Sequence, residues 1–162
     1  MGLDMYFYAR KTTYKSHAKW NKSEVDETNY PEDLKVFADY IYDCNFKSVD
    51  IETYYQIGYF RKFNALHSYI VKNFAGGRDN CQNIFLSKGN VEQIKAALDE
   101  ALEAGTEEKA KDVLPTQSGF FFGSTTYDDF YFEDVKEATD LMQMLLDNFD
   151  FKNYELIYGA SW

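Results

Sequence analysis

Residues 58–74, GYFRKFNALHSYIVKNF, carry the strongest periodic signal in the chain. Their apolar side chains recur at a spacing of about 3.6 residues and therefore share one face of a predicted helix. These side chains are Phe60, Phe63, Ile70, Val71 and Phe74. Gly76 and Gly77 follow at once, and glycine is favoured just past the C-terminus of a helix. We therefore expect an amphipathic helix over 58–74 with this face on the core.

Alternating residues on either side of this segment predict strands. Along residues 3–10 every second side chain is apolar, which is typical of a half-buried strand. Apolar runs at 84–86 and 154–158 predict two further strands, and residues 45–57 alternate more weakly. The chain therefore supplies three or four short strands for one sheet.

Helical spacing recurs in other segments. These are residues 31–43, 90–104 and 126–148, with the acidic stretch 106–113 either helical or irregular. Asn90 and Thr126 are expected to cap two of these helices, with Gln93 and Asp129 in the positions of a capping box. Strands and helices do not alternate strictly along the chain. We therefore expect an α+β fold, in which three to four helices pack on a small, mainly antiparallel sheet.

The length of the chain limits its domain organisation. A chain of 162 residues is long enough for one domain with its own core and too short for two typical ones. Residues 11–30 are polar and carry several lysines around Trp20. We expect a single globular domain over 1–162, with a polar, basic excursion at about 11–30.

The composition excludes several function classes. The longest apolar runs, such as Phe120-Phe121-Phe122, are far shorter than the roughly 18 residues of a membrane span. Asp4 interrupts the N-terminus, which therefore does not resemble a secretory signal. Cys44 and Cys81 are too few for a disulfide framework and too isolated for a zinc site. We expect a cytoplasmic protein that contacts no membrane.

The formal net charge of -10 is concentrated in one part of the chain. Residues 91–155 contain five lysines against sixteen acidic residues. This balance argues against direct nucleic-acid binding, which needs clustered cations. The acidic residues either coat solvated helices or imitate nucleic acid in the basic cleft of a partner protein.

Two polar residues fall inside the apolar face of the 58–74 segment. Asn64 and His67 lie one turn apart there, with Arg61 and Lys62 beside them. A buried polar group without a partner costs about 1–3 kcal/mol, so both residues need partners. They either tie the helix to a neighbouring segment or line a pocket with Arg61 and Lys62 at its mouth. In the second case the four residues form a set of donors suited to a small anionic ligand.

A second unusual segment could complete such a pocket. Residues 116–125, TQSGFFFGST, place three phenylalanines between two glycines and flank them with hydroxyl groups. Glycine permits close backbone approach, and hydroxyls both donate and accept hydrogen bonds. The segment forms either a strand between two turns or a loop packed by its own aromatic rings. It lacks the lysine of a nucleotide-hydrolase phosphate loop.

The predicted ligand-binding residues come from both segments and from the residues that follow the second one. They are Arg61, Lys62, Asn64, His67, Thr116, Gln117, Ser118, Gly119, Phe121, Ser124, Tyr127 and Asp128. Tyr127 and Phe121 could stack on a base.

Catalytic and metal chemistry find little support. His67 is a weak candidate for a general base, because the Gly-x-Ser-x-Gly nucleophile motif is absent. Asp128, Asp129, Glu133 and Asp134 could hold a hard cation. Acids in the first turn of a helix are more often there for capping and the helix dipole. We expect no metal and no cofactor. A non-enzymatic protein is favoured, and catalysis through His67 stays open as an alternative.

Three sequence blocks resemble a family of small uncharacterised proteins of bacteriophages and prophages. They are Met1-Gly2-Leu3-Asp4-Met5-Tyr6, Tyr59-Phe60-Arg61-Lys62-x-Asn64-x-Leu66-His67, and Leu114-Pro115-Thr116-Gln117-Ser118-Gly119-Phe120-Phe121-Phe122-Gly123-Ser124-Thr125 with Tyr127-Asp128. Asn80-Cys81 is a further match, and Phe60 stands where the family pattern has tryptophan. The resemblance implies a phage protein in the cytoplasm of a bacterial host and no known reaction.

Three functions remain open. The first is a non-enzymatic binding protein that sequesters a small phosphorylated or nucleotide ligand to counter host defence. The second is an inhibitor that binds a host defence or nucleic-acid-binding protein through acids such as Glu100, Glu103, Glu107 and Glu108. The third is a small hydrolase or transferase with His67 as general base. Thirty aromatic residues also predict an exposed aromatic patch, which could support a homodimer.

Overall fold

The computed structural model describes residues 2–16 and 48–162. Contacts within the chain divide it into two compact units, residues 1–10 with 54–162 and residues 11–53. The candidate site and all of the helices described below belong to the first unit. The predicted helix over 31–43 and most of the predicted excursion at 11–30 lie outside the described residues.

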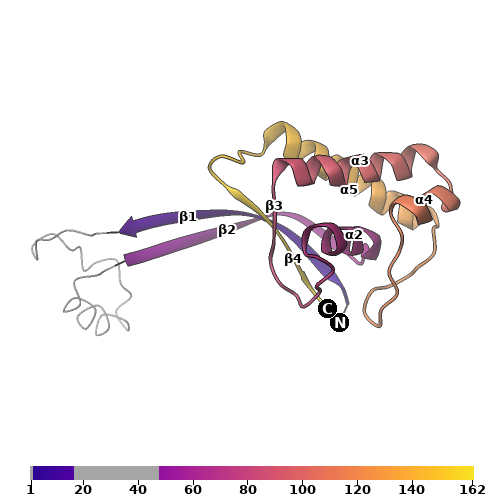
Figure 1. Cartoon of the computed structure of the whole chain (residues 1–162), viewed down its shortest axis with the longest axis horizontal. Helices are drawn as coiled ribbons and strands as arrows, with labels where there is room; N and C mark the ends of the chain where they lie inside the picture. Colours follow the sequence, from indigo (N-terminus) through magenta and orange to yellow (C-terminus); the bar gives the residue numbers. More distant parts are fainter. Residues whose placement is uncertain (1, 17–47) are drawn as a thin grey trace, which may run out of the picture. The chain divides into compact units, whose positions relative to one another are not determined.

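The described strands form one four-stranded antiparallel sheet (Figure 1). Its strands are β1 (Asp4–Ser16), β2 (Ser48–Arg61), β3 (Ile84–Leu86) and β4 (Glu155–Ser161), in the order β2-β1-β4-β3. β4 pairs with β1 on one side, with Phe7 opposite Tyr158, and with β3 on the other, with Phe85 opposite Ile157. The chain therefore joins its two ends at the centre of the sheet.

The helices of the described residues complete the predicted α+β fold. They are α2 (Asn64–Phe74), α3 (Lys88–Ala104), α4 (Glu107–Val113) and α5 (Asp129–Asn148). α3 packs along α5 and also contacts α4, and all of these helices are visible in Figure 1. None of them combines the length and apolar character that crossing a membrane requires.

Two predicted helix caps are wrong by a few residues. Ser87 caps α3 and Asn90 occupies the N3 position of the capping box, where its side chain accepts from the backbone of Ser87. Asp128 caps α5 by accepting from the Tyr131 backbone, and the Thr126 hydroxyl donates to Asp128 instead. In both cases two residues able to cap a helix lie within three positions of each other in the sequence, and the sequence does not show which of them is the cap.

The helix predicted over 58–74 begins later than expected. Residues up to Arg61 belong to β2, and α2 begins only at Asn64. Phe60 and Phe63 are both buried, so they match the helical spacing although one lies on a strand and the other precedes the helix. Tyrosine, isoleucine and phenylalanine favour strands, and pairing within the sheet decides the conformation of this stretch.

The first strand is longer than the alternation of apolar residues indicates. β1 continues through residues 11–16, which were expected to belong to the polar excursion. Threonine and tyrosine in this stretch favour extended backbone, whereas the apolar alternation that marks a half-buried strand stops at Ala9. The pattern therefore detects the part of the strand that packs on the core and misses the rest.

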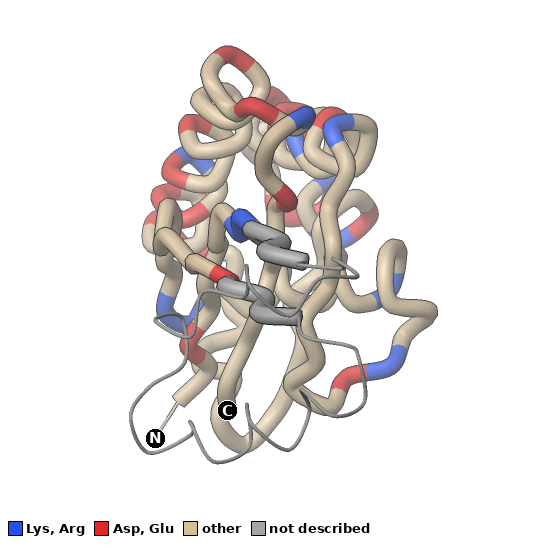
Figure 2. Tube along the Cα trace, turned by 90° about the vertical axis from the view of Figure 1, so that its left-hand side faces the viewer, with Lys and Arg blue, Asp and Glu red and all other residues tan. Residues whose placement is uncertain are grey.

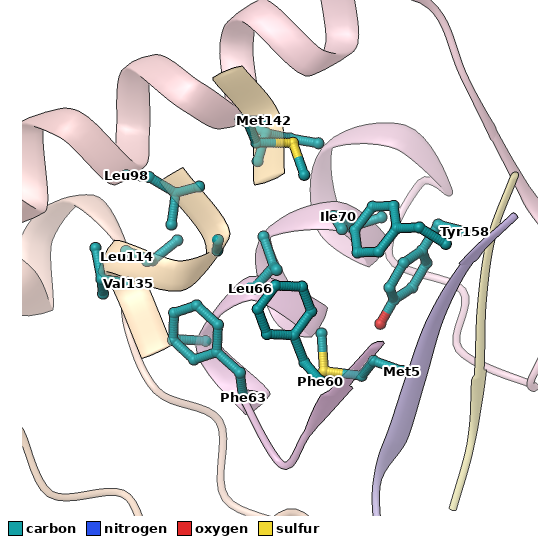
Figure 3. Close-up of a cluster of buried hydrophobic side chains, with 14 of the residues drawn as sticks. Met5, Phe60, Phe63, Leu66, Ile70, Leu98, Leu114, Val135, Met142 and Tyr158 are labelled. Atoms are coloured by element: carbon teal, nitrogen blue, oxygen red, sulfur yellow. The ribbon is translucent and has the colours of Figure 1, made fainter. Parts of the chain in front are cut away.

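The core lies between the sheet and the helices (Figure 3). Met5 and Tyr158 approach it from β1 and β4, while Leu98 and Met142 approach it from α3 and α5. All four side chains are almost completely buried. Alternate residues of β1 and the apolar stripes of the helices thus share one contiguous core, as the predicted patterns require.

Truncating the core should destabilise the fold strongly. Leu98→Ala removes a fully buried side chain between α3 and its neighbours, so we expect a loss of about 3 kcal/mol. Leu102→Ala on the same helix removes a half-buried side chain and should cost clearly less. Urea unfolding with an unchanged m-value measures both losses. Equal losses would contradict the described packing of α3.

Candidate functional site

A cavity of about 260 Å³ lies where β2 ends, beside the loop of residues 114–128 and the start of α5. The residues that line it come from these three segments and from residues 62–64, which lead from β2 into α2. They are Arg61, Lys62, Phe63, Asn64, Thr116, Gly123, Ser124, Thr126, Asp128, Phe130, Tyr131 and Asp134. The two segments singled out by the sequence therefore meet at one hollow.

Asn64 ties the 114–128 loop to the first turn of α2. Its Nδ2 donates to the carbonyl oxygens of Phe122 at 2.9 Å and Ser124 at 2.8 Å. Its Oδ1 accepts from the backbone N–H of Gln117 at 2.9 Å. The side chain is only 3% exposed, so all three bonds are shielded from water. Of the two roles left open for Asn64, the structure gives it the structural tie, and the tie forms one wall of the cavity.

Lys62 runs between two glycines. A Cβ on Gly2 would come within 2.6 Å of Lys62 Cε, and a Cβ on Gly123 would come within 3.1 Å of Lys62 Cδ. Gly123 also has φ 86°, in the left-handed region that favours glycine. The N-terminal block and the Gly119–Gly123 block therefore both make room for the same lysine side chain.

Arg61 is already engaged at the edge of the cavity. Its Nη1 donates to Asp4 Oδ1 at 3.0 Å, and the Tyr59 hydroxyl donates to the same oxygen. The hydrogen bond with Tyr59 and the charge of Asp4 raise the pKa of Arg61. Arg61 is therefore ion-paired with Asp4. This pairing makes the guanidinium of Arg61 less available to a ligand than the sequence suggests.

Hydroxyl groups line the side of the cavity next to α5. Ser124 and Thr126 share a hydrogen bond between their hydroxyls at 2.7 Å, and the Thr126 hydroxyl also contacts Asp128 Oδ2 at 2.8 Å. The hydrogen bond from Thr126, followed by that from the Tyr131 backbone, lowers the pKa of Asp128. Asp128 therefore carries a stable negative charge while it caps α5.

Asp134 lies in the second turn of α5 and lines the same cavity. Burial raises its pKa to about 6, and repulsion from Glu137, Glu133 and Asp128 adds to the shift. A carboxyl group with a strongly raised pKa in a hollow is a frequent feature of functional sites. The sequence pattern includes Asp134 only as a possible cation ligand.

His67 does not line the cavity. Its Nε2 lies 3.0 Å from Asp79 Oδ2 and its Nδ1 lies 2.7 Å from the Tyr158 hydroxyl. Because a carboxylate only accepts, Nε2 carries the proton in the contact with Asp79. The ring is 1% exposed, and Phe122 packs edge-on against it at 5.4 Å. His67 therefore joins α2 to β4, and neither ring nitrogen is available to a substrate here.

The cavity brings together half of the predicted ligand-binding residues. Those that line it are Arg61, Lys62, Asn64, Thr116, Ser124 and Asp128, and those that do not are His67, Gln117, Ser118, Gly119, Phe121 and Tyr127. Gln117 and Tyr127 instead fix the loop, through Asn64 and Thr116 respectively. Phe121 accepts a backbone hydrogen bond from Leu3.

The remaining lining residues were not among the predicted ligand-binding residues: Phe63, Gly123, Thr126, Phe130, Tyr131 and Asp134. Phe63, Phe130 and Tyr131 supply apolar walls, and Asp134 supplies a second carboxylate. The available signal was the spacing on α5, where positions 131 and 134 lie on the same helix face as the Asp128 cap. No group of three or more metal-ligating side chains assembles within 2–16 and 48–162, so the predicted acidic cluster forms no such group there.

Removing the Asn64 tie should loosen the loop as well as the fold. Asn64→Leu keeps a similar volume but leaves two carbonyls and one N–H without their partner, so we expect a loss of at least about 2 kcal/mol. Amide exchange of residues 117–124 should accelerate. Asn73→Leu is the control, since Asn73 is exposed on the same helix and its side chain donates to the Tyr69 carbonyl within that helix. A variant with unchanged exchange in the loop would refute the tie.

Asp134 should make stability depend on pH. Its pKa rises from 3.8 to about 6 on folding, so the stability present below pH 3.8 is lost as the pH rises through 6. Asp134→Asn should therefore be more stable than the wild type near pH 7.5, by about 1 kcal/mol once solvent screening is allowed for. The stabilities of Asp134→Asn and of the wild type should become equal towards pH 4. Thermal melts across this range, with the exposed Asp140→Asn as control, measure the difference.

Comparison of the chain with protein-family models, with curated proteins and with solved structures finds no match. The geometry of the cavity and the charges around it are therefore the observations that bear on function.

Proposed function

We propose that this chain is a non-enzymatic binding protein that holds a small phosphorylated ligand in the cavity between β2, the 114–128 loop and α5. The observation that carries the proposal is the convergence of Lys62 with the backbone and hydroxyl groups of this loop on one hollow. Lys62 supplies the positive charge, and Thr116 and Ser124 line the same cavity. Their hydroxyls now bond to Thr125, Tyr127 and Thr126, so a phosphate would have to replace these bonds to accept from them. A phosphate group accepts hydrogen bonds from both kinds of donor.

The size of the cavity favours a compact ligand. Sites for drug-sized molecules usually measure about 300–1,000 Å³. The cavity described here is somewhat smaller, at about 260 Å³. It could enclose a small phosphorylated sugar. Of a nucleotide it would enclose only a part, and the rest would lie outside the cavity.

The setting of this function follows from the resemblance of three sequence blocks to phage proteins. A phage protein that sequesters a phosphorylated signal in the bacterial cytoplasm would weaken a host defence that depends on that signal. Gly2, Lys62 and Gly123 come from three of these blocks, and their side-by-side packing supports a common role for the blocks.

The two other functions draw less support from the described residues. A general base needs an accessible nitrogen, and both ring nitrogens of His67 are engaged. Among the acids proposed to imitate nucleic acid, Glu100 pairs with Lys109 and Glu107 pairs with Lys111. Figure 2 shows acidic positions spread along the helical part of the chain, as expected for a solvated helix surface.

Binding can be tested by thermal shift and calorimetry with inorganic phosphate, ribose 5-phosphate and AMP. A ligand present at 100 times its dissociation constant should add about 2.7 kcal/mol of stability. Lys62→Met should weaken binding of the best probe at least about tenfold, because it removes the cation that contacts the phosphate. Lys72→Met is the matched control, since Lys72 is exposed on α2 and does not line the cavity.

The proposal fails on either of two results. One is the absence of any shift with all three probes at millimolar concentration. The other is equal binding by wild type and Lys62→Met while Lys72→Met also binds normally.

A further inference from the structure

Two oppositely charged residues that line the cavity have no charged or hydrogen-bonding partner in the part of the chain that the structure describes. Lys62 forms no ion pair there, and the carboxylate of Asp134 accepts no hydrogen bond there. They are not paired with each other, because their charged atoms are not within ion-pairing distance of 4.0 Å. The cavity is therefore lined by a cation and a carboxylate whose charged atoms lie more than 4.0 Å apart, so a ligand group could lie between them.

The other polar groups of the cavity are already satisfied. Asn64 uses both amide hydrogens and its oxygen on the loop. Asp128 accepts from Thr126 with one oxygen and from the Tyr131 backbone with the other. Arg61 is engaged by Asp4. Among the charged groups that line the cavity, Lys62 and Asp134 are therefore the two whose charge is not met by a neighbour in the described residues.

The environment of Asp134 favours a positive group from outside. Glu133, Glu137 and Asp128 surround it with negative charge, which together with burial makes its ionised form unfavourable. A bound ammonium group would offset both effects, because an opposite charge within about 4–6 Å favours the ionised carboxylate. A second phosphate at this end would instead add repulsion.

We propose that the ligand is a compact zwitterion, which places a phosphate on Lys62 and a protonated amine on Asp134. This inference rests on the proposed phosphate-binding function and adds to it the second charged group of the ligand. Phe63, Phe130 and Tyr131 line the same cavity and suit a short apolar linker between the two groups. Polyphosphates are disfavoured, because two carboxylates, those of Asp128 and Asp134, line the same cavity and would repel further phosphate groups.

The test uses probes that differ by one charged group. O-phosphoethanolamine carries both the phosphate and the amine, ethyl phosphate lacks only the amine, and ethylamine lacks only the phosphate. We expect O-phosphoethanolamine to bind the full chain at least about tenfold more tightly than either single-charge probe, which corresponds to about 1.4 kcal/mol. Calorimetry near pH 7.5 measures all three affinities.

Two variants assign the preference to its residues. Asp134→Asn should bind O-phosphoethanolamine and ethyl phosphate equally, whereas Lys62→Met should lose both. Asp140→Asn and Lys72→Met, which change exposed residues outside the cavity, should behave like the wild type. Melting curves of every variant establish that it is folded.

The outcomes separate this inference from the function on which it rests. Equal binding of O-phosphoethanolamine and ethyl phosphate by the wild type overturns the zwitterion and leaves phosphate binding intact. A preference that persists in folded Asp134→Asn also overturns it, because the amine then has another partner. Binding of neither phosphate probe overturns both the inference and the proposed function.

Discussion

The three hydrogen bonds of Asn64 hold the site together. They join the first turn of α2 to a loop more than fifty residues further along the chain. Because the amide is almost fully buried, losing it would leave three backbone groups unpaired in a poorly solvated place. The loop in turn positions Gly123 against Lys62, so the direction of the lysine side chain depends on an amide that need not touch the ligand.

A structural tie and a pocket wall are therefore not alternatives at Asn64, because the same side chain is both. Asn64 and His67 both serve as ties, one to the 114–128 loop and the other to Asp79 and β4. The first tie borders the cavity of the candidate site, and His67 does not line that cavity. The difference follows from what packs beside each residue, since the ring of Phe122 fills the space next to His67.

Local sequence patterns predicted the features that depend on residues nearby in the sequence, such as burial. They missed the features that depend on residues far away in the sequence, such as hydrogen-bond partners. The burial of Asn64 and His67 followed from their place in an apolar stripe. Their partners lie 12 to 91 residues away and leave no periodic trace. The β2–α2 boundary was missed because strand pairing, which is non-local, overrode a helical spacing that Phe60 and Phe63 share. Asp134 became part of the site only because α5 turns its face towards the end of β2.

The acidic character of the chain bears on the charge of its ligand. A net charge of -10 repels a free anion at distances within the Debye length of about 8 Å, while a single lysine attracts it only locally. A zwitterion has little net charge on approach, so it avoids this repulsion and still presents a phosphate to Lys62. Its amine then neutralises a carboxylate that burial and three acidic neighbours keep from ionising freely. The overall charge and the arrangement within the cavity thus favour the same class of ligand.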